Sequence, residues 1–213
     1  MPERIESAAS IAYRLLERKI VTLELPPGAA VTEGDLIAAT GLGRTPVREA
    51  IQRLAWEGLV DVRPRAGLAV AALHAADWMK VLDARRGVEI LLARSAANSA
   101  TPEAVELFYS AALAMERAAN AGDVLAFLDA DKSFDEALAE AADNGFAARV
   151  AQPLQTHSRR FWYRFQRNAS LAESAAGHVE IIQAILARDP DRAEIEVGRL
   201  NATLRGFAEK AVG

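Results

Sequence analysis

The sequence has no cysteine among its 213 residues, which excludes disulfide bonds and thiol-ligated zinc. It also has no apolar run near the roughly 18 residues that a membrane-spanning helix needs. The first ten residues are charged and lack the apolar stretch of a secretory signal peptide. There is no low-complexity tract and no fixed-period repeat, which excludes a solenoid. These absences predict a soluble cytoplasmic protein without a membrane partner.

Charge is distributed unevenly along the chain. The protein carries 25 Lys and Arg against 29 Asp and Glu, and its net charge of −4 argues against a general nucleic-acid binder. The first 74 residues are neutral, with nine basic and nine acidic residues, and the remainder is acidic. Residues 44–65 nevertheless contain five arginines: Arg44, Arg48, Arg53, Arg63 and Arg65. This stretch predicts a local basic surface on an acidic protein.

The first third of the chain predicts helices and a hairpin. Apolar residues recur at helical spacing across residues 5–25, and the PPG at 26–28 ends that helix. Thr32 can cap a second helix, with Asp35 in the capping-box position and Gly41 at its end. The runs LVDV and LAVAAL, joined by RPRAG, predict a hairpin with a basic turn.

A third helix follows the second after about four residues, as in a helix-turn-helix. Its sequence is RTPVREAIQRLAWEG, in which Thr45 is the expected N-cap, Pro46 suits the first turn and Gly58 ends the helix. One face should be buried, because four apolar residues recur at helical spacing: Val47, Ala50, Ile51 and Leu54. Arg48 and Gln52 lie four residues apart on another face.

No strand signal follows Ala75. Six helices with short breaks are predicted, near residues 75–99, 101–121, 123–142, 145–168, 171–188 and 190–211. Each carries an apolar stripe, so together they predict an antiparallel all-helical bundle. The fold class is therefore mainly α, with a winged helix-turn-helix over residues 1–74 and a helical bundle over residues 75–213.

The basic stretch has two interpretations. Its arginines can be merely solvated, with Glu49 and Arg53 as an ordinary ion pair four residues apart on a helix. Alternatively, the third helix lies in the major groove of DNA, where an arginine grips guanine with two hydrogen bonds. Thr45 and the N–H groups of the first turn can then hold a phosphate. The basic turn of the hairpin can reach the adjacent minor groove.

The pattern E-x-x-L…G-L-G-R-T-P-V-R-E-A-I-x-R-L…E-G-L-V…P-R-x-G-x-x-V resembles the winged-helix domain of GntR-family bacterial transcription regulators, over roughly residues 5–73. The resemblance implies double-stranded operator DNA as the partner. It also implies contacts by Arg44, Thr45 and Arg48, and by Arg65 and Gly67 in the wing. Gln52, on the same helix face as Arg48, is a further candidate. Two positions depart from the pattern. Gly43 stands where the family usually has serine or threonine, and Gly34 where some relatives place a DNA-contacting arginine.

Residues 75–213 resemble the helical effector domain, called FCD, of the FadR branch of this family, in its six-helix VanR-like form. Four signals carry the resemblance: R-x-x-E at Arg86 to Glu89, D-x-x-F-D at Asp131 to Asp135, Asn144, and H-x-x-I-I-x-A-I at His178 to Ile185. It implies a domain that dimerises the protein and encloses a pocket. Many members bind one divalent metal there through an aspartate and three histidines, often together with a small carboxylate effector.

The metal pattern is eroded in this chain. By resemblance, Asp131 and His178 match two of the ligands. Asp135 stands where a histidine is usual, and Leu200 stands where another is expected. Asn201 is adjacent but rotated by about 100° around the helix. Two carboxylates and one imidazole can still hold a divalent ion with waters, and they favour Mg or Mn over zinc. The alternatives are solvated carboxylates or a pocket without a metal.

Three arginines are candidates for holding an anionic effector, because arginine grips a carboxylate in a bidentate fork. They are Arg86, Arg160 and Arg164. Arg86 can instead pair with Asp83 or Glu89 on the helix surface. The other two share a helix side with His157, in the stretch HSRRFWYRFQR. Such interleaving can stack on single-stranded nucleic acid, but Phe161 and Phe165 are better interpreted as core residues.

These patterns predict a homodimeric, ligand-responsive transcription regulator. The simplest form is a repressor that a small anionic effector releases from an inverted-repeat operator. An activator, or a regulator with a vestigial pocket, is the alternative within this class. A metal-dependent enzyme using Asp131, Asp135 and His178 belongs to a different class, and no nucleophile–base pair or cofactor motif supports it. A pure interaction scaffold leaves the RTPVRE pattern unexplained.

Overall fold

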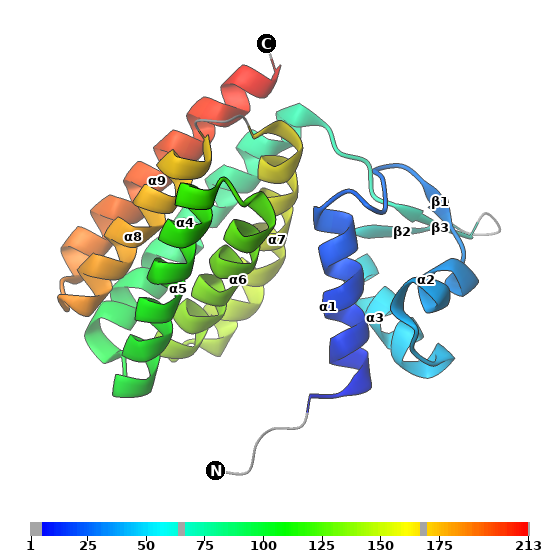
Figure 1. Ribbon diagram of the computed structural model, residues 1–213, viewed down its shortest axis with the longest axis horizontal. Helices are drawn as coiled ribbons and strands as arrows, with labels where there is room; N and C mark the ends of the chain where they lie inside the picture. The colour runs from blue at the N-terminus through cyan, green and yellow to red at the C-terminus, as the bar shows by residue number, and fades with distance from the viewer. Residues whose placement is uncertain (1–5, 64–66, 167–169, 213) are drawn as a thin grey trace. The chain divides into compact units, whose positions relative to one another are not determined.

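The computed structural model describes residues 6–63, 67–166 and 170–212 of the chain. The chain divides into two units, Met1–His74 and Ala75–Gly213 (Figure 1). None of the helices in the described stretches combines the length and the apolar character that crossing a membrane requires.

The first unit is a winged helix-turn-helix. It runs through α1 (Ala8–Val21), β1 (Ala30–Val31), α2 (Glu33–Thr40), α3 (Arg44–Trp56), β2 (Val60–Arg63) and β3 (Gly67–Val70). The predicted inward face of α3 is confirmed, because all four of its apolar residues are buried. They share one core with residues of α1, α2 and the strands: Ala12, Tyr13, Leu16, Ile20, Leu36, Leu59, Val60 and Val70.

The three strands form an antiparallel sheet in the order β1-β3-β2. The predicted hairpin is confirmed, and its register pairs Asp61 with Ala69 and Arg63 with Gly67. Strand β1, which the sequence did not predict, pairs with the other edge of β3. Two residues are too few to show the alternation by which a strand is recognised. Arg65 and the rest of the hairpin turn lie outside the described residues.

Helix α2 begins and ends as predicted. The Thr32 side chain accepts from the Asp35 N–H at 3.1 Å, and the Asp35 carboxylate accepts from the Thr32 N–H at 2.8 Å. This reciprocal pair is the expected capping box. Gly41 ends the helix at a φ of +68°, in the left-handed region that glycine adopts without a steric penalty.

Helix α3 begins two residues earlier than predicted, so the expectation that Thr45 is its N-cap is wrong. The N-cap is Gly43, whose extended backbone (φ −69°, ψ 166°) carries no side chain that could cap the helix. A Thr-Pro step is compatible with the first turn as well as with the boundary, and it therefore does not fix the first helical residue. Thr45 lies exposed on the first turn instead.

The second unit is an all-helical bundle (Figure 1). Its helices are α4 (Ala75–Ser99), α5 (Pro102–Ala121), α6 (Val124–Ala141), α7 (Gly145–Phe165), α8 (Ser170–Leu186) and α9 (Pro190–Val212). Helix α4 packs on α7 and α9, α5 packs on α6 and α8, and α6 packs on α7. Side-chain caps on Thr101, Asp123 and Asn144 start α5, α6 and α7, which explains why these boundaries are readable in the sequence.

The aromatic stretch of α7 belongs to the core of this bundle. Trp78 of α4 stacks on Phe161 with ring centroids 6.0 Å apart, and on Phe165 at 6.1 Å. The prediction that these phenylalanines enter the core is confirmed for Phe161, which is buried, whereas Phe165 is half-buried. These contacts hold α7 against α4. They also fix which polar residues of α7 point into the bundle.

Candidate functional site

Helix α3 presents its polar side to solvent. Arg44 and Arg48 lie one helical turn apart, and their side chains are 71% and 58% exposed. Thr45 and Gln52 are exposed as well. Because the apolar residues of α3 are buried in the core, the helix cannot rotate these polar residues inward. Four of the predicted contact residues therefore share one accessible helix.

Glu33, the first residue of α2, holds both arginines. Its Oε1 lies 3.2 Å from Nε of Arg44, and its Oε2 lies 2.7 Å from Nε of Arg48. A carboxylate at the first turn of a helix is favoured there by the helix dipole. The pairs are solvent-exposed, and such pairs contribute at most about 1 kcal/mol each. Glu33 therefore orients the two guanidinium groups, but each can leave it and bind another acceptor.

A groove of about 580 Å³ separates α3 from the sheet within the first unit. It brings together Arg48, Gln52 and Gly67, which the sequence suggested separately. Gly67 has a φ of +86°, a conformation that other residues rarely adopt, so a glycine suits the start of β3. The groove is lined by Ala30, Val31, Thr32, Glu33, Arg48, Ile51, Gln52, Val62, Gly67 and Leu68.

Arg53 differs from the other arginines of α3. Its Nε donates to Glu57 Oε1 at 2.9 Å, and its guanidinium lies 3.7 Å from the centroid of the Tyr13 ring. The Tyr13 hydroxyl donates to the other oxygen of Glu57 at 2.6 Å. Burial and the neighbouring acidic residues raise the pKa of Tyr13 above its ordinary value. Arg53 therefore links α3 to α1. Its ion-pair partner is Glu57, whereas the sequence suggested Glu49.

In the helical unit, the expectation for Arg86 is off by one residue. Arg86 is exposed on α4, whereas Arg85 is buried. Arg85 donates from Nε to Glu89 Oε1 at 2.6 Å and from Nη1 to Ser158 Oγ at 2.9 Å. Neighbouring helical residues point about 100° apart, so an arginine pair on one helix sends only one member inward. Arg85 is the α4 arginine that lines a small cavity inside the bundle, next to His178.

The expected pocket role of Arg160 and Arg164 also needs correction. Arg164 is exposed, and its guanidinium lies over the Phe165 ring at 5.3 Å. Arg160 is completely buried but is not among the residues that line the cavity around His178. The arginine of α7 that does line it is Arg159.

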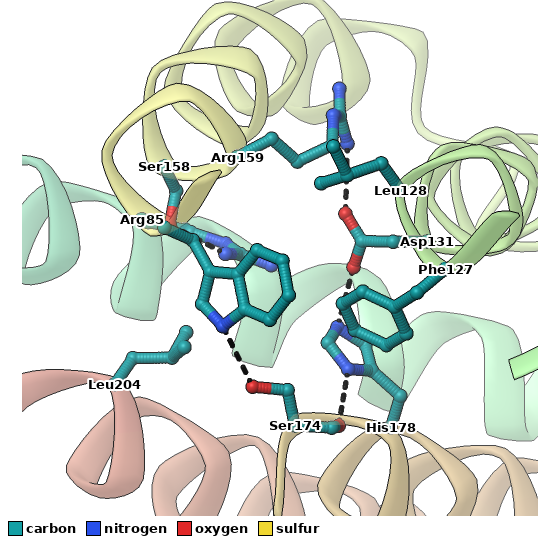
Figure 2. Close-up of a pocket in the computed structure, with 10 residues that line it drawn as sticks. Arg85, Phe127, Leu128, Asp131, Ser158, Arg159, Ser174, His178 and Leu204 are labelled. Atoms are coloured by element: carbon teal, nitrogen blue, oxygen red, sulfur yellow. Dashed lines mark hydrogen bonds and ion pairs between the residues drawn. The ribbon is translucent and has the colours of Figure 1, made fainter. Parts of the chain in front are cut away.

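Asp131, Asp135 and His178 come together in the interior, where each is at most 5% exposed. His178 Nε2 lies 2.8 Å from Asp131 Oδ1, and His178 Nδ1 lies 2.7 Å from the Ser174 carbonyl oxygen (Figure 2). Arg159 of α7 faces the two carboxylates. Its Nη1 is 3.3 Å from Asp131 Oδ2 and donates to Asp135 Oδ2 as well. The cluster therefore joins α6, α7 and α8.

The pKa shifts in this cluster follow from the burial of each group and from the charges of its neighbours. Burial disfavours the ionised Asp131 carboxylate, but His178, Arg159 and Arg85 outweigh this effect and hold the pKa of Asp131 well below its usual value. Burial and the negative charge of Asp131 raise the pKa of Asp135 to about 7. For His178, burial is outweighed by the facing Asp131 carboxylate, and the pKa of the imidazole is raised.

These side chains do not fit a metal ion as they are placed. Among residues 6–63, 67–166 and 170–212, no group of three or more histidine, aspartate or glutamate side chains is arranged to hold one. Leu200 is buried and packs on Gly177, next to His178. The Asn201 amide donates to the Leu82 carbonyl at 2.9 Å, which confirms that Asn201 points elsewhere.

Two cavities meet at Arg159. The cavity around His178 has about 20 Å³, which is room for roughly one water molecule (Figure 2). Its lining residues are Arg85, Phe127, Leu128, Asp131, Ser158, Arg159, Trp162, Ser174, His178 and Leu204. A larger cavity of about 230 Å³ is lined by residues of α6 and α7: Lys132, Asp135, Glu136, Ala139, Ala148, Arg149, Gln152, Gln155 and Arg159.

Two family models match the chain. Residues 8–70 match "Bacterial regulatory proteins, gntR family", and residues 80–200 match "FCD domain". The chain belongs to the GntR family. Its FCD domain fits the FadR branch, as the sequence motifs indicated.

Curated relatives agree with this assignment, and a solved structure shares the fold. The chain is 31% identical over 188 residues to the "Probable D-xylose utilization operon transcriptional repressor" of Paenarthrobacter nicotinovorans, with 88% of this chain and 83% of that protein covered. It is 28% identical to the "HTH-type transcriptional repressor RspR" of Escherichia coli strain K12, over 85% of this chain and 80% of that one. The solved structure "E. coli McbR/YncC" shares the fold with a TM-score of 0.83, at 17% identity, covering 98% and 100% of the two chains. The protein is therefore a DNA-binding transcription regulator, and not an enzyme.

Sequence reasoning missed three residues of these sites. Glu33 is a usual first-turn glutamate in the sequence, and only the packing of α2 on α3 brings it to the arginines. Arg85 and Arg159 are each adjacent to an arginine that was considered. No local pattern marks Arg159, because only the packing of α7 on α6 brings it to the carboxylates. The sequence could suggest only that a buried carboxylate pair requires a cation.

Proposed function

We propose that the protein is a ligand-responsive repressor, which binds an inverted-repeat operator as a homodimer and releases it when a small anion binds in the helical unit. The observation that carries this proposal is the groove where Arg48, Gln52 and Gly67 meet beside the exposed Arg44. Two relatives that are named as repressors support the sign of regulation.

In this proposal α3 enters the major groove of the operator. Arg44 and Arg48 exchange Glu33 for guanine edges or phosphates, because an exposed ion pair is weak enough to be displaced. The first turn of α3 has no side-chain cap at Gly43, so its N–H groups can donate to a phosphate. The exposed Thr45 hydroxyl is a further donor for the backbone of the duplex.

A homodimer follows from the symmetry that such operators have. Two winged-helix units read two half-sites, and an inverted repeat mirrors the two-fold axis of the protein. An effector that binds one arrangement of the dimer better than another shifts the population towards it. The spacing of the two α3 helices then no longer matches the half-sites, and the operator affinity falls.

The effector in this proposal binds in the 230 Å³ cavity lined by α6 and α7. The lining combines three cations with two amides and two acids: Lys132, Arg149 and Arg159, Gln152 and Gln155, Asp135 and Glu136. A carboxylate or phosphate finds several charge-assisted donors in such a lining. The cavity around His178 holds about one water, which is too little for an organic anion.

The test of DNA recognition begins with selection of binding sites from a random duplex library. Fluorescence anisotropy then measures the affinity of the selected duplex for the wild type and for Arg48→Ala. We expect Arg48→Ala to weaken specific binding by roughly thirtyfold or more, because each lost guanine contact costs about 1–3 kcal/mol in each of two protomers. Arg164→Ala, an exposed arginine of α7, is the matched control and should bind normally. Equal affinities for wild type and Arg48→Ala contradict the assignment.

The test of the effector site titrates succinate, citrate and inorganic phosphate into the complex of protein and selected duplex. We expect at least one of these anions to lower the operator affinity of the wild type. Arg149→Gln removes an exposed cation of the cavity and should require severalfold more anion for the same release. Arg192→Gln, which pairs with Glu180 outside this cavity, is the control. An effect of the anions that is the same in Arg149→Gln and the wild type speaks against this cavity.

A further inference from the structure

Arg159 lies where a metal ion would have to bind. Two of the expected metal ligands are Asp131 and Asp135, and the guanidinium of Arg159 contacts an oxygen of each. Figure 2 shows Arg159 pointing at Asp131 from one side while His178 faces it from the other. Both carboxylate oxygens of Asp131 thus already have a cationic or N–H partner. A metal ion would have to displace one of these partners.

The position of Arg159 is fixed from its own side as well. Its Nη2 lies 3.2 Å from the Thr156 hydroxyl on the preceding turn of α7, and Thr156 is completely buried. Helix α7 is in turn held by the stacking of Phe161 on Trp78. The guanidinium is therefore a built part of the bundle, since its side chain is only 7% exposed.

Acidic and basic side chains already face one another in this cluster without a metal. Three carboxylates, those of Glu89, Asp131 and Asp135, face two guanidinium groups, those of Arg85 and Arg159. The imidazole of His178 faces Asp131 at 2.8 Å. A divalent ion would add two positive charges at a position where Arg159 already supplies one. Burying such an excess in a low-dielectric interior is strongly unfavourable.

The fourth expected ligand position cannot contribute either. Leu200 packs so closely that its Cδ1 would lie 2.9 Å from a Cβ added to Gly177. The side chain thus fills the space beside Gly177 with a methyl group, and the separate cavity around His178 has only about 20 Å³. Leu200 and Arg159 both disfavour metal binding. The leucine removes a ligand, and the arginine adds a positive charge.

We propose that Arg159 is the resident cation of this domain, in place of the divalent metal that the family resemblance implies. The regulator then folds and binds its operator without a metal. The role of Arg159 towards an effector rests on the proposed function, whereas the exclusion of metal from the cluster is independent of it.

The first experiment uses the full-length wild type. Thermal unfolding is measured after EDTA treatment, and again after addition of Mn²⁺, Ni²⁺ or Zn²⁺. We expect the same Tm in all conditions, because a ligand raises Tm only when it binds the native state. A rise in Tm with any of these ions that is absent in His178→Ala overturns the proposal.

Operator binding in the same buffers separates this inference from the proposed function. Equal affinity for the selected duplex with EDTA and with Mn²⁺ supports metal independence. Loss of DNA binding in both buffers counts against the proposed function and leaves the Tm result standing. DNA binding that requires Mn²⁺ and is abolished by EDTA counts against a metal-free cluster.

A second experiment removes the guanidinium. In Arg159→Ala, two carboxylates and one imidazole face an emptied space, and we expect Ni²⁺ or Mn²⁺ now to stabilise the protein. At about a hundredfold excess over Kd the rise in Tm should be roughly 5–10 °C. The control Arg159→Ala/His178→Ala should lose this rise. If Arg159→Ala is unfolded without metal, recovery of its helical circular dichroism on adding Ni²⁺ is the same result. A variant that responds to no metal, folded or unfolded, shows that Arg159 does not occupy the metal position.

Discussion

Glu33 pairs through one carboxylate with Arg44 and Arg48, the two arginines that we propose contact DNA, and this gives it two opposing effects. It orients Arg44 and Arg48 before DNA arrives, which reduces the conformational entropy lost on binding. It also competes with phosphates for the same guanidinium groups. Competition weakens every DNA complex, but a site with well-placed guanines replaces the lost ion pair with two directed hydrogen bonds. Glu33 should therefore matter more for specificity than for affinity.

The residue-scale prediction concerns Glu33→Gln. We expect the affinity for random-sequence DNA to rise by roughly two- to fivefold, because exposed ion pairs of up to about 1 kcal/mol no longer compete. The affinity for the selected operator should rise less, so the ratio of specific to non-specific binding falls. Anisotropy titrations on both duplexes measure this ratio. Glu49→Gln makes the same change in net charge on the exposed side of α3, and an identical response of the two variants would show that only net charge matters.

The orientation of a single residue could be predicted where the apolar residues of its helix lie on one face. On α3 the apolar residues lie on one side, so the exposed positions of Arg48 and Gln52 followed from spacing. Helix α4 is 25 residues long and packs on several neighbours, and its apolar residues do not mark a single face. Spacing there could not decide between Arg85 and Arg86. Arg159 needed the packing of α7 on α6, which no local pattern contains.

At the scale of elements, the loop between α2 and α3 has a glycine on each side of Leu42. The two glycines differ in whether the backbone requires a glycine there. Gly41 sits at a φ of +68°, where a side chain is strained. Gly43 has an ordinary extended backbone, and a Cβ added there would come no closer than 3.9 Å to Pro46. The first glycine is thus required by the backbone and the second is not.

The element-scale prediction compares these two positions. Gly43→Ser should stabilise α3 by a few tenths of a kcal/mol, because serine is a somewhat better N-cap than glycine. Its hydroxyl should also tighten operator binding severalfold, as one added hydrogen bond contributes about 0.5–1.5 kcal/mol. Gly41→Ser should instead lower the stability by about 1–2 kcal/mol. Thermal unfolding and operator anisotropy report the two effects, and equal losses of stability in both variants would contradict this account.

Boundaries that require a particular residue type were predictable, and those that several residue types can form were not. The capping box of Thr32 and Asp35 and the stop at Gly41 were readable because each needs a particular residue type. The start of α3 was misplaced because Gly43, Arg44 and Thr45 can all occupy the turn before a helix. Strand β1 was missed for a related reason, since Ala30 and Val31 owe their pairing to β3 rather than to their own sequence.

For the molecule as a whole, the sequence was sufficient to predict the fold class. Strand signals are confined to the first third, and the helical pattern is continuous afterwards, so a winged unit followed by a bundle was the simplest solution. The interior of the bundle could not be predicted in the same way. The size of the cavities and the partner of each buried charge depend on side chains from α6, α7 and α8 together.

A cation that belongs to the polypeptide has a consequence for the cell. A metal-dependent regulator is complete only when the cytoplasmic supply of its ion is adequate, and it can be loaded with the wrong ion when supplies change. With Arg159 in that position, each newly made chain carries its charge from synthesis onwards. Its response to the effector is then the same in iron-, manganese- or zinc-starved bacteria as in replete ones. Under this proposal, the activity of the regulator does not vary with the concentration of metal ions in the cell.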